Sequence, residues 1–377
     1  MARKRANGEG SISKRKNGTW EARLFINGKR HTMYAPTQRE AKARLEELKT
    51  KLATGAYMEP NEYTVGSWLK EWMEDYQVPR VKRSTAERYQ LDIERYIAPE
   101  IGEISLQGLT SPMLQKFFNK VYKSGLSEKS VRNLHGVIHE ALEQAVRCEL
   151  INKNVSEMCL LPKVRKPEMH PLKDEKVQEF LHAIKGHRYE SLYYFLMFTG
   201  LRESEAIGLM WSCVDLEHGK ITVDKQLQKS RCGHGEIYFS TPKNGKGRTF
   251  TVAPSVIEVL KKVRAQQEEW RSLCGTKWQN KDNLVFTTEL GRHVSCHTLY
   301  NNFKDIVRSI DLPETRIHDL RHTFATLAIQ NHVDIKTVSE MLGHATVAFT
   351  LDRYGHMTEM MQKQACDRLQ RFIDGLE

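Results

Sequence analysis

The chain has 377 residues, of which 40% are hydrophobic and 28% charged, and it carries a net charge of +11 at pH 7. This composition is ordinary for two or three globular domains, and the sequence contains no run of about 18 uncharged apolar residues that could form a membrane span. The basic N-terminus lacks the apolar core of a secretory signal, and the seven cysteines include no Cys-x-x-Cys pair, so we expect a cytoplasmic protein without a disulfide scaffold or a cysteine zinc site.

The positive charge is concentrated at the N-terminus. Residues 1–55 contain fourteen Lys and Arg against five Glu, a net charge of +9, whereas the rest of the chain carries only +2. A nucleic acid is the obvious polyanionic partner for so basic a block. Composition alone leaves open a tail that only aids solubility.

The same basic block carries strand signals. Alternate residues from Trp20 to Ile26 are apolar, and the Asn-Gly pairs at 17–18 and 27–28 supply the positive φ angles that tight hairpin turns need. We therefore predict a three-stranded meander with strands at about 10–16, 19–26 and 29–34. Residues 37–40 form a capping-box sequence that opens a helix, and the apolar face of this helix would cover one side of the sheet.

The uncovered side of this sheet is a candidate DNA-binding surface, because a small exposed sheet can enter the major groove. The alternative is a module that only adds stability and whose charges are solvated. The side chains expected to contact DNA are Lys14, Arg15, Arg23, Phe25, Lys29 and Arg30.

The next region, residues 62–155, has the pattern of a bundle of about four helices. Its clearest apolar stripe runs from Val131 to Ala145 at helical spacing, and Ser84–Glu87 is a capping-box sequence that would open another helix. Residues 55–61 have the composition of a linker, and the basic segment Pro162–Pro167 marks a second boundary.

The remaining residues mix helices and strands. Helices are predicted near 174–184 and 190–197, and strands near 221–226, 237–240 and 249–252, the last two forming a hairpin marked by Asn244-Gly245. The rest of the chain is predicted to be mainly helical. No phosphate-binding loop, no Gly-x-Gly-x-x-Gly and no complete His-Glu-x-x-His motif occurs.

The expected fold class is therefore multidomain. The predicted domains are a small three-stranded sheet with a helix (1–55), an all-α helical bundle (62–160) and a mainly α, mixed α+β domain (168–377).

Four short motifs stand out in the third region: Thr199–Glu205 (TGLRESE), Thr241–Arg248 (TPKNGKGR), His318–Thr323 (HDLRHT), and Leu342–His344 (LGH) followed ten residues later by Tyr354. Together they resemble the T-G-L-R-x-x-E, H-x-L-R-H and L-G-H motifs and the C-terminal tyrosine of the tyrosine recombinase (phage integrase) family, in its order and at its typical separations. The resemblance covers the whole chain and is greatest to integrases of conjugative transposons and temperate phages. It implies an arm-type DNA-binding domain, a core-binding domain and a catalytic domain, in that order.

The residue types in these motifs suit phosphodiester cleavage. A phenol has a pKa of about 10, so Tyr354 is a weak nucleophile unless the phosphate is neutralised. Arg202 and Arg321 can each donate two parallel hydrogen bonds to phosphate oxygens without losing their charge, and such donors act where negative charge develops. His318 and His344 could add hydrogen bonds or carry the tyrosine proton.

The family resemblance implies more specific roles. His318 matches the acid/base histidine near the nucleophile, His344 occupies the His/Trp position that supports the phosphate, and Lys243 matches the hairpin lysine that protonates the leaving 5′-oxygen. By itself Lys243 could be a solvated turn charge, and a second lysine lies three residues away; the preceding Thr-Pro favours Lys243. Glu205, one helical turn beyond Arg202, is expected to orient that arginine through an ion pair rather than to act as a base.

A metal site is a weaker interpretation of the histidines. His318 and His322 share a spacing of four residues, and His344 and His356 follow, but no carboxylate or cysteine completes a good zinc set. Two arginines already supply the positive charge that a metal would bring, so no cofactor is expected.

The main functional hypothesis is a site-specific recombinase that integrates and excises a mobile element. Covalent attachment to Tyr354 would conserve the energy of the broken phosphodiester and make ATP unnecessary. The resemblance further implies a 3′-phosphotyrosyl link, a Holliday junction, double-stranded DNA with core and arm sites, and a homotetramer. A directionality factor that biases excision would be another partner. The segment at 357–373 could pack on a neighbouring subunit, as in the family, or in cis.

Two other classes of function remain to be distinguished. A DNA-binding regulator would need the basic block and the bundle but none of the six polar residues of the motifs. A type IB topoisomerase uses the same chemistry, yet relaxation needs no second recognition module, so the N-terminal sheet favours recombination.

Overall fold

The computed structural model describes residues 10–26, 28–54, 57–164, 171–232, 235–242, 245–354, 366–367 and 369–376. The chain folds into two compact units, residues 1–165 and 166–377. The first unit contains two separate hydrophobic clusters, one in the N-terminal sheet and one in the helices that follow. The division of this unit near residues 55–62 stays a prediction.

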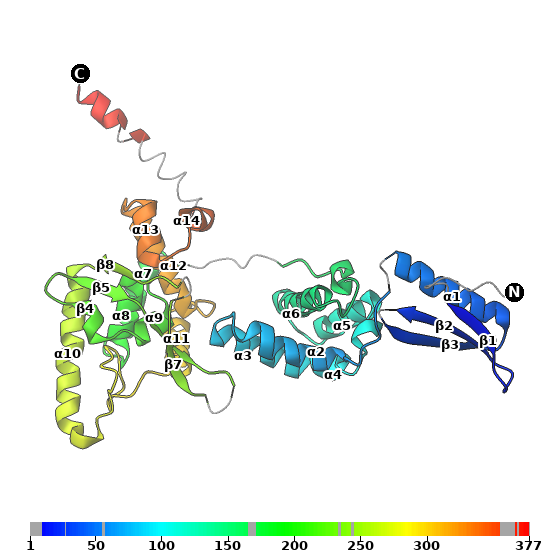
Figure 1. Cartoon of the computed structure of the whole chain (residues 1–377). Helices are drawn as coiled ribbons and strands as arrows, with labels where there is room; N and C mark the ends of the chain where they lie inside the picture. Colours follow the sequence, from blue (N-terminus) through cyan, green and yellow to red (C-terminus); the bar gives the residue numbers. More distant parts are fainter. Residues whose placement is uncertain are drawn as a thin grey trace. The chain divides into compact units, whose positions relative to one another are not determined.

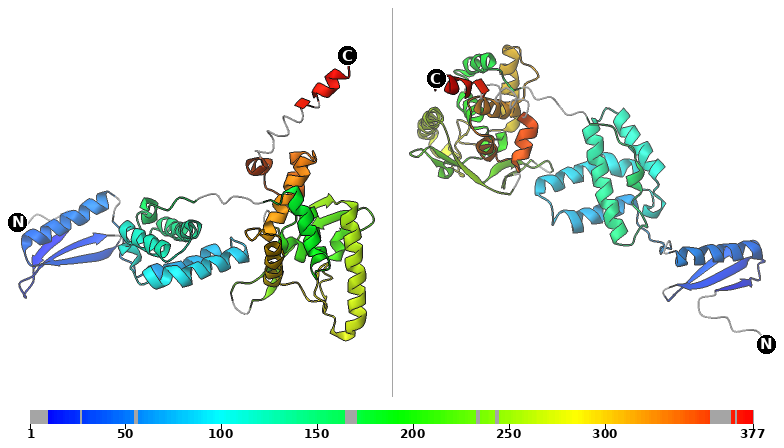
Figure 2. Two further views of the ribbon diagram at one scale, coloured as in Figure 1. Left: turned by 180° about the vertical axis from the view of Figure 1, so that it is seen from behind. Right: turned by 90° about the horizontal axis from the view of Figure 1, so that it is seen from above.

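The N-terminal sheet has the predicted meander topology. Strands β1 (Ser11–Lys14), β2 (Trp20–Ile26) and β3 (Lys29–Ala35) pair antiparallel in that order, and helix α1 (Gln38–Ala53) lies across one face (Figure 2). Thr37 caps α1 by accepting a hydrogen bond from the backbone N–H of Glu40. The apolar residues at alternate positions of β2 are buried with the apolar face of α1, so the period-two pattern correctly identified the covered face.

The helical bundle of the first unit consists of four helical segments, as the apolar stripes predicted. These run through α2 (Val65–Glu71) and the π-helix η1 (Trp72–Gln77); α3 (Arg83–Asp92), the π-helix η2 (Ile93–Ile97) and α4 (Ala98–Ile101); α5 (Ser111–Lys123); and α6 (Glu128–Arg147). Short 3-10 turns lie at η3 (Leu106–Gly108) and η4 (Val155–Met158). The long apolar stripe of α6 is buried against the other helices.

The predicted capping box at 84–87 is wrong. Helix α3 begins at Arg83, its N-cap is Lys82 in an extended conformation, and no side chain caps it. Ser84 therefore lies inside the first turn, and Glu87 forms an ion pair with Arg83 at 3.0 Å rather than reaching back to a cap. Because the helix begins at Arg83, Ser84 already has a helical position and cannot be the N-cap residue.

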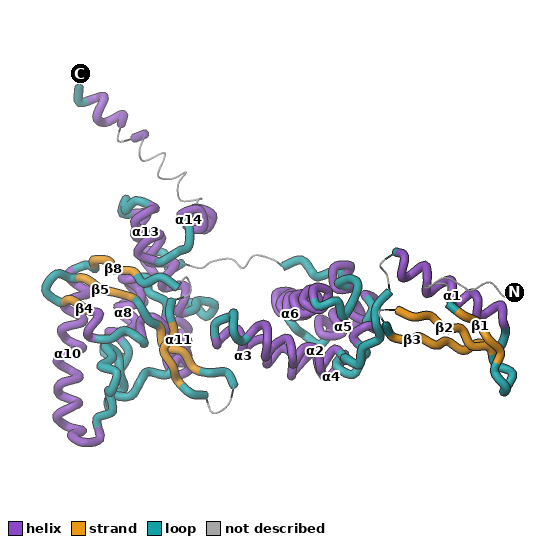
Figure 3. The backbone as a smooth tube through the Cα atoms, in the orientation of Figure 1, coloured by secondary structure: helices purple, strands orange, loops and turns teal. Residues whose placement is uncertain are grey.

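The second unit is mainly helical with short strands (Figures 1 and 3). Its helices are α7 (Asp174–Ile184), α8 (Glu190–Thr199), α9 (Glu203–Ile207), α10 (Pro254–Cys274), α11 (Cys296–Ser309), α12 (Ile317–Gln330), α13 (Ile335–Leu342) and α14 (Val347–Tyr354), with 3-10 turns η5 (Trp211–Cys213) and η6 (Gly275–Lys277). Its strands are β4 (Val214–Asp215), β5 (Lys220–Val223), β6 (Gln226–Lys229), β7 (Ile237–Ser240) and β8 (Arg248–Thr251). The observed domain classes match the expected multidomain fold.

The strand pairing in this unit differs from the prediction. The single strand expected at 221–226 is two strands in two sheets, β4-β5-β8 and β6-β7, so β7 and β8 do not form the expected hairpin. Two consecutive exposed residues, Asp224 and Lys225, interrupt the alternation of buried and exposed positions. Because a shift of one residue moves every later side chain to the opposite face, this interruption sends the chain into a second sheet.

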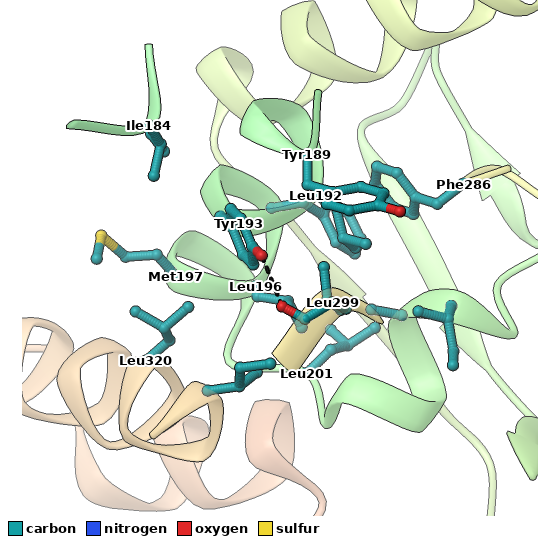
Figure 4. Close-up of a cluster of buried hydrophobic side chains, with 14 of the residues drawn as sticks. Ile184, Tyr189, Leu192, Tyr193, Leu196, Met197, Leu201, Phe286, Leu299 and Leu320 are labelled. Atoms are coloured by element: carbon teal, nitrogen blue, oxygen red, sulfur yellow. Dashed lines mark hydrogen bonds between the residues drawn. The ribbon is translucent and has the colours of Figure 1, made fainter. Parts of the chain in front are cut away.

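Helix α8 forms the centre of the second unit. It packs against α10 and α12, and Leu192, Tyr193, Leu196 and Met197 are buried at its core-facing positions (Figure 4). The Tyr193 hydroxyl donates a 2.8 Å hydrogen bond to the backbone carbonyl of Leu299, which satisfies the one polar atom of this side chain inside the core. A rigid α8 fixes the position of the motif that follows it.

Two further predictions concern the C-terminal segment and membrane-spanning helices. Of the C-terminal segment 357–373, the structure describes residues 366–367 and 369–373, where Leu369, Phe372 and Ile373 are exposed. Within the described part of the chain, no helix is long and apolar enough to cross a membrane.

Candidate active site

The first motif is held by a glycine turn. Helix α8 ends at Gly200, which has a φ of +63°, and a Cβ atom there would lie 2.5 Å from the Phe324 ring and 2.8 Å from Leu342. Only glycine fits both the left-handed backbone and the packing. The next residue, Leu201, is buried in the core (Figure 4), so the turn delivers Arg202 in a fixed position before α9.

Glu205 is the fully buried centre of an ion-pair network. It accepts hydrogen bonds from the Arg202 guanidinium at 2.7 Å and from the Arg202 backbone N–H at 3.0 Å, and its two oxygens pair with Arg248 at 2.7 and 3.2 Å. Burial alone would raise the pKa of Glu205, but the hydrogen bond and charge of Arg248 and the charge of Arg202 outweigh it and lower the pKa to about 2. At neutral pH the carboxylate is therefore an anion that orients Arg202, and it is too weak a base to take up a proton.

Arg248 is a site residue that sequence reasoning missed. Besides pairing with Glu205, it donates a 2.7 Å hydrogen bond through Nε to the backbone carbonyl of Met341, the residue just before the fourth motif. A Cβ atom at Gly343 would lie 2.9 Å from this guanidinium, so the glycine of the L-G-H motif makes room for Arg248. The available signal was its position as the last residue of the second motif, Thr241–Arg248.

Arg321 connects the first and last motifs. Its guanidinium donates to the backbone carbonyls of Gly200 at 2.8 Å and Leu342 at 2.6 Å, and the residue is only 3% exposed. Burial and the positive charge of Arg202 lower the pKa of Arg321 to about 9, which leaves it charged at neutral pH. Two of the five guanidinium N–H groups serve these carbonyls, so Arg321 is positioned by the protein itself.

His318 and His344 lie beside these arginines and are neutral. Although His318 is an exposed residue, partial loss of hydration and then the charges of Arg321 and Arg202 lower its pKa to about 4. The same causes lower the pKa of His344 to about 3, and its Nδ1 lies 2.8 Å from the Thr350 hydroxyl. Both rings can therefore donate or accept one hydrogen bond without adding charge.

Tyr354, the last residue of α14, is buried at 3% exposure in a small apolar cluster with α12 and α13. Its hydroxyl lies 2.7 Å from Nδ1 of His322. Burial raises the pKa of Tyr354 to about 12, although the charges of Arg321 and Arg353 oppose the shift. At neutral pH the phenol is protonated, as the ordinary pKa of tyrosine led us to expect.

Five of the six predicted catalytic residues thus come together from distant segments: Arg202, His318, Arg321, His344 and Tyr354. Lys243 lies outside the described residues, so its role stays a prediction. The described neighbour Lys246 is exposed. In the described part of the chain, no group of three or more His, Cys, Asp or Glu side chains is arranged to hold a metal ion.

The register of the N-terminal sheet divides the predicted DNA contacts between two faces. Phe25, which is 67% exposed, pairs with Arg30 on the face opposite α1, and Arg15 lies 5.1 Å over the Tyr34 ring. Arg23 is on the same face and forms an ion pair with Glu21 at 2.8 Å. The two remaining residues, Lys14 and Lys29, lie on the face that α1 covers. In the sheet register, Lys14 pairs with Trp20 and Lys29 pairs with Ile26.

The geometry has a clear chemical capacity. Two oriented guanidiniums, neutral imidazoles and a protonated phenol can neutralise a phosphodiester and present a nucleophile to it. The segments that carry these groups are joined by direct hydrogen bonds: Arg321 binds the turn before Arg202 and the carbonyl two residues before His344, and His322, the neighbour of Arg321, binds Tyr354.

Comparison with known proteins agrees with this arrangement. The model of the phage integrase family matches residues 170–361, and that of its N-terminal SAM-like domain matches residues 64–122. The XerC-like tyrosine recombinase of Caldanaerobacter subterraneus subsp. tengcongensis is 28% identical over 363 residues, which cover 91% of this chain and 92% of the relative.

Two solved structures share the fold. The Tn1549 transposon integrase in complex with a circular intermediate DNA has a TM-score of 0.68 at 21% identity, covering 82% of this chain and all of the solved one. A λ integrase tetramer bound to a Holliday junction has a TM-score of 0.55 at 16% identity, covering 89% and 95%. Because the family model spans half of the sequence, including every described catalytic candidate, the chain belongs to the phage integrase family and is a tyrosine-type site-specific recombinase.

Proposed function

We propose that this recombinase integrates and excises a mobile DNA element through a 3′-phosphotyrosyl intermediate and a Holliday junction. The observation that carries the proposal is the double role of Arg321, whose guanidinium binds the carbonyl of Gly200 on one side and that of Leu342 on the other. These hydrogen bonds link the motif of Arg202 to that of His344, and the hydrogen bond between His322 and Tyr354 adds the last motif, which supports a single catalytic centre. The likeness to a transposon integrase in complex with a circular intermediate DNA supports a mobile element as the substrate.

In the proposed cleavage step, the Tyr354 oxygen attacks a DNA phosphorus and the 5′-oxygen leaves. Arg202 and Arg321 neutralise the charge that develops on the non-bridging oxygens, an effect worth about 3–4 kcal/mol for each preorganised donor. His344 adds a hydrogen bond to the phosphate. Lys243 donates a proton to the leaving oxygen.

In the proposed rejoining step, the 5′-hydroxyl of another strand attacks the phosphotyrosyl bond and releases Tyr354. One phosphodiester forms for each that breaks, so the exchange needs no nucleotide cofactor. Two such rounds on two duplexes pass through a four-way junction.

The proposed partners are double-stranded DNA at core and arm sites, three further copies of this chain on DNA, and a directionality factor for excision. The tetramer is supported by the likeness to λ integrase, whose tetramer binds a Holliday junction. The exposed apolar residues at 369–373 are available either to a neighbouring subunit or to the same chain.

A topology assay tests the proposed function. With a supercoiled plasmid that carries two copies of the element's joined ends, we expect products that differ in circle size or linkage. A DNA-binding regulator would only retard the plasmid in a gel, and a topoisomerase would relax it without exchanging strands. Either of those results would overturn the proposal.

The N-terminal sheet provides a second test, in arm-site binding. Arg30→Ala should weaken binding to arm sites and reduce the slope of log affinity against log salt by about 1, because one phosphate contact is lost. The matched control is Lys42→Ala, which removes the same charge from the exposed surface of α1. Equal losses in the two variants would show that the open face of the sheet has no special role.

A further inference from the structure

The hydrogen-bond partner of the candidate nucleophile is not the histidine that the family resemblance assigns to acid/base chemistry. Tyr354 Oη lies 2.7 Å from Nδ1 of His322, whereas His318 contacts the His322 ring edge-on at 5.0 Å between ring centres. The His322 and Tyr354 ring centres are 6.0 Å apart. Among the described residues, His322 is thus the imidazole in direct contact with the phenol.

The direction of this hydrogen bond follows from the charges around it. Burial, and then the neighbouring His318, Arg321 and Arg353, lower the pKa of His322 to about 4, so the ring is neutral and has one donor and one acceptor nitrogen. Tyr354 is protonated and almost fully buried, and a buried hydroxyl needs a partner for its proton. The phenol therefore donates to Nδ1, and the His322 proton sits on Nε2.

We propose that His322 accepts the proton of Tyr354 when the phenol attacks DNA, and so acts as the general base of strand cleavage. As the bond from Oη to phosphorus forms, the phenol proton moves to Nδ1 of His322, and the bond from phosphorus to the 5′-oxygen breaks. During rejoining the imidazolium returns this proton to the phenolate oxygen. The inference rests on the proposed role of Tyr354 as nucleophile.

The electrostatics of the site determine when this transfer occurs. Without DNA, the cations around His322 disfavour an imidazolium, so the phenol keeps its proton. A bound phosphodiester brings a negative charge that offsets Arg321 and makes the imidazolium more favourable. The groups that act on His322 are His318 and Arg321 on its own helix α12 and Arg353 on α14, while His322 in turn acts on His344. Proton transfer is thereby coupled to substrate binding.

The test compares His322→Asn with His322→Leu in the full-length protein, using single-turnover cleavage of a nicked suicide substrate made from the element's core site. The Asn side chain can accept a hydrogen bond near the position of Nδ1 but cannot take up a proton, whereas Leu removes both properties. We expect both variants to bind the DNA and to cleave about 10²- to 10³-fold more slowly than the parent, in the range typical of general-base loss.

The pH profile separates a base from a hydrogen-bond partner that only positions the phenol. In the parent, the cleavage rate should level off near neutral pH; in His322→Asn, it should rise steadily with pH, because the phenol must then ionise without help. A parent-like rate and profile in His322→Asn would overturn the inference even if His322→Leu does not fold. Adduct formation by a Tyr354→Phe protein would instead overturn the nucleophile assignment, so the two failures are distinguishable.

Discussion

Substitution of Tyr354 by Phe should abolish the covalent protein–DNA adduct while leaving DNA binding unchanged. The phenol oxygen is the proposed attacking atom, and loss of a nucleophile in a comparable covalent enzyme lowers the rate by as much as about 10⁶-fold. Phe keeps the ring that fills the apolar cluster of α12, α13 and α14, and the lost hydrogen bond to His322 should cost about 1 kcal/mol of stability. The protein should therefore stay folded.

The measurement is a denaturing gel of the protein with a nicked suicide substrate, in which a retained adduct migrates as a band of higher mass. Tyr300→Phe on α11 is the matched control, because its side chain is 43% exposed and removal of its hydroxyl should leave adduct formation intact. If the Tyr354→Phe protein still forms the adduct, the nucleophile is another residue.

The second large effect is expected on stability, from Glu205→Gln. The carboxylate is fully buried between the guanidiniums of Arg202 and Arg248. Gln keeps one acceptor oxygen but turns an amide donor toward these donors and leaves two partly buried cations without an anion. Breaking a buried ion pair in this way costs about 3–5 kcal/mol. Chemical denaturation measures this loss, and Glu258→Gln, whose side chain is 64% exposed on α10, should change stability little.

The same carboxylate gives a pH dependence of defined sign. The pKa of Glu205 is lowered from 4.5 to about 2 in the folded protein, so its contribution is complete above pH 4.5 and disappears as the pH falls toward 2. This shift corresponds to roughly 3 kcal/mol. As the pH falls, the three site histidines lower the stability first, from about pH 6.5 downward. Their pKa values lie near 3 to 4 in the folded protein, so the unfolded chain takes up protons before the folded one.

Glu205→Gln should therefore reduce the loss of stability between pH 4.5 and 2, while the histidine-dependent loss that begins near pH 6.5 remains, since Glu205 is only the smallest of the charges that act on His318. Urea titrations at a series of pH values would test this separation. A variant that retains the full loss of stability between pH 4.5 and 2 would show that other carboxylates cause it.

The amino-acid sequence by itself determined the sheet and the bundle and predicted which residues are the reactive groups. These features depend on local signals: the alternation in β2, the Asn-Gly turn before it, the stripe of α6, and the glycines that end α8 and α13. Each signal acts over a few neighbouring residues and needs no knowledge of the rest of the fold. The motif order then indicated the family without any coordinate.

Only the tertiary structure decided how these groups are oriented. Arg248 and Glu205 are 43 residues apart in the chain, and Arg321 and the Gly200 carbonyl are 121 apart. Likewise, the partner of the phenol is His322 rather than His318, and the strand expected at 221–226 divides between two sheets. Such pairings depend on how whole helices and strands pack around α8. The sequence pattern permits many arrangements, but burial of an unpaired polar group is costly, so the folded protein adopts the one in which these groups are paired.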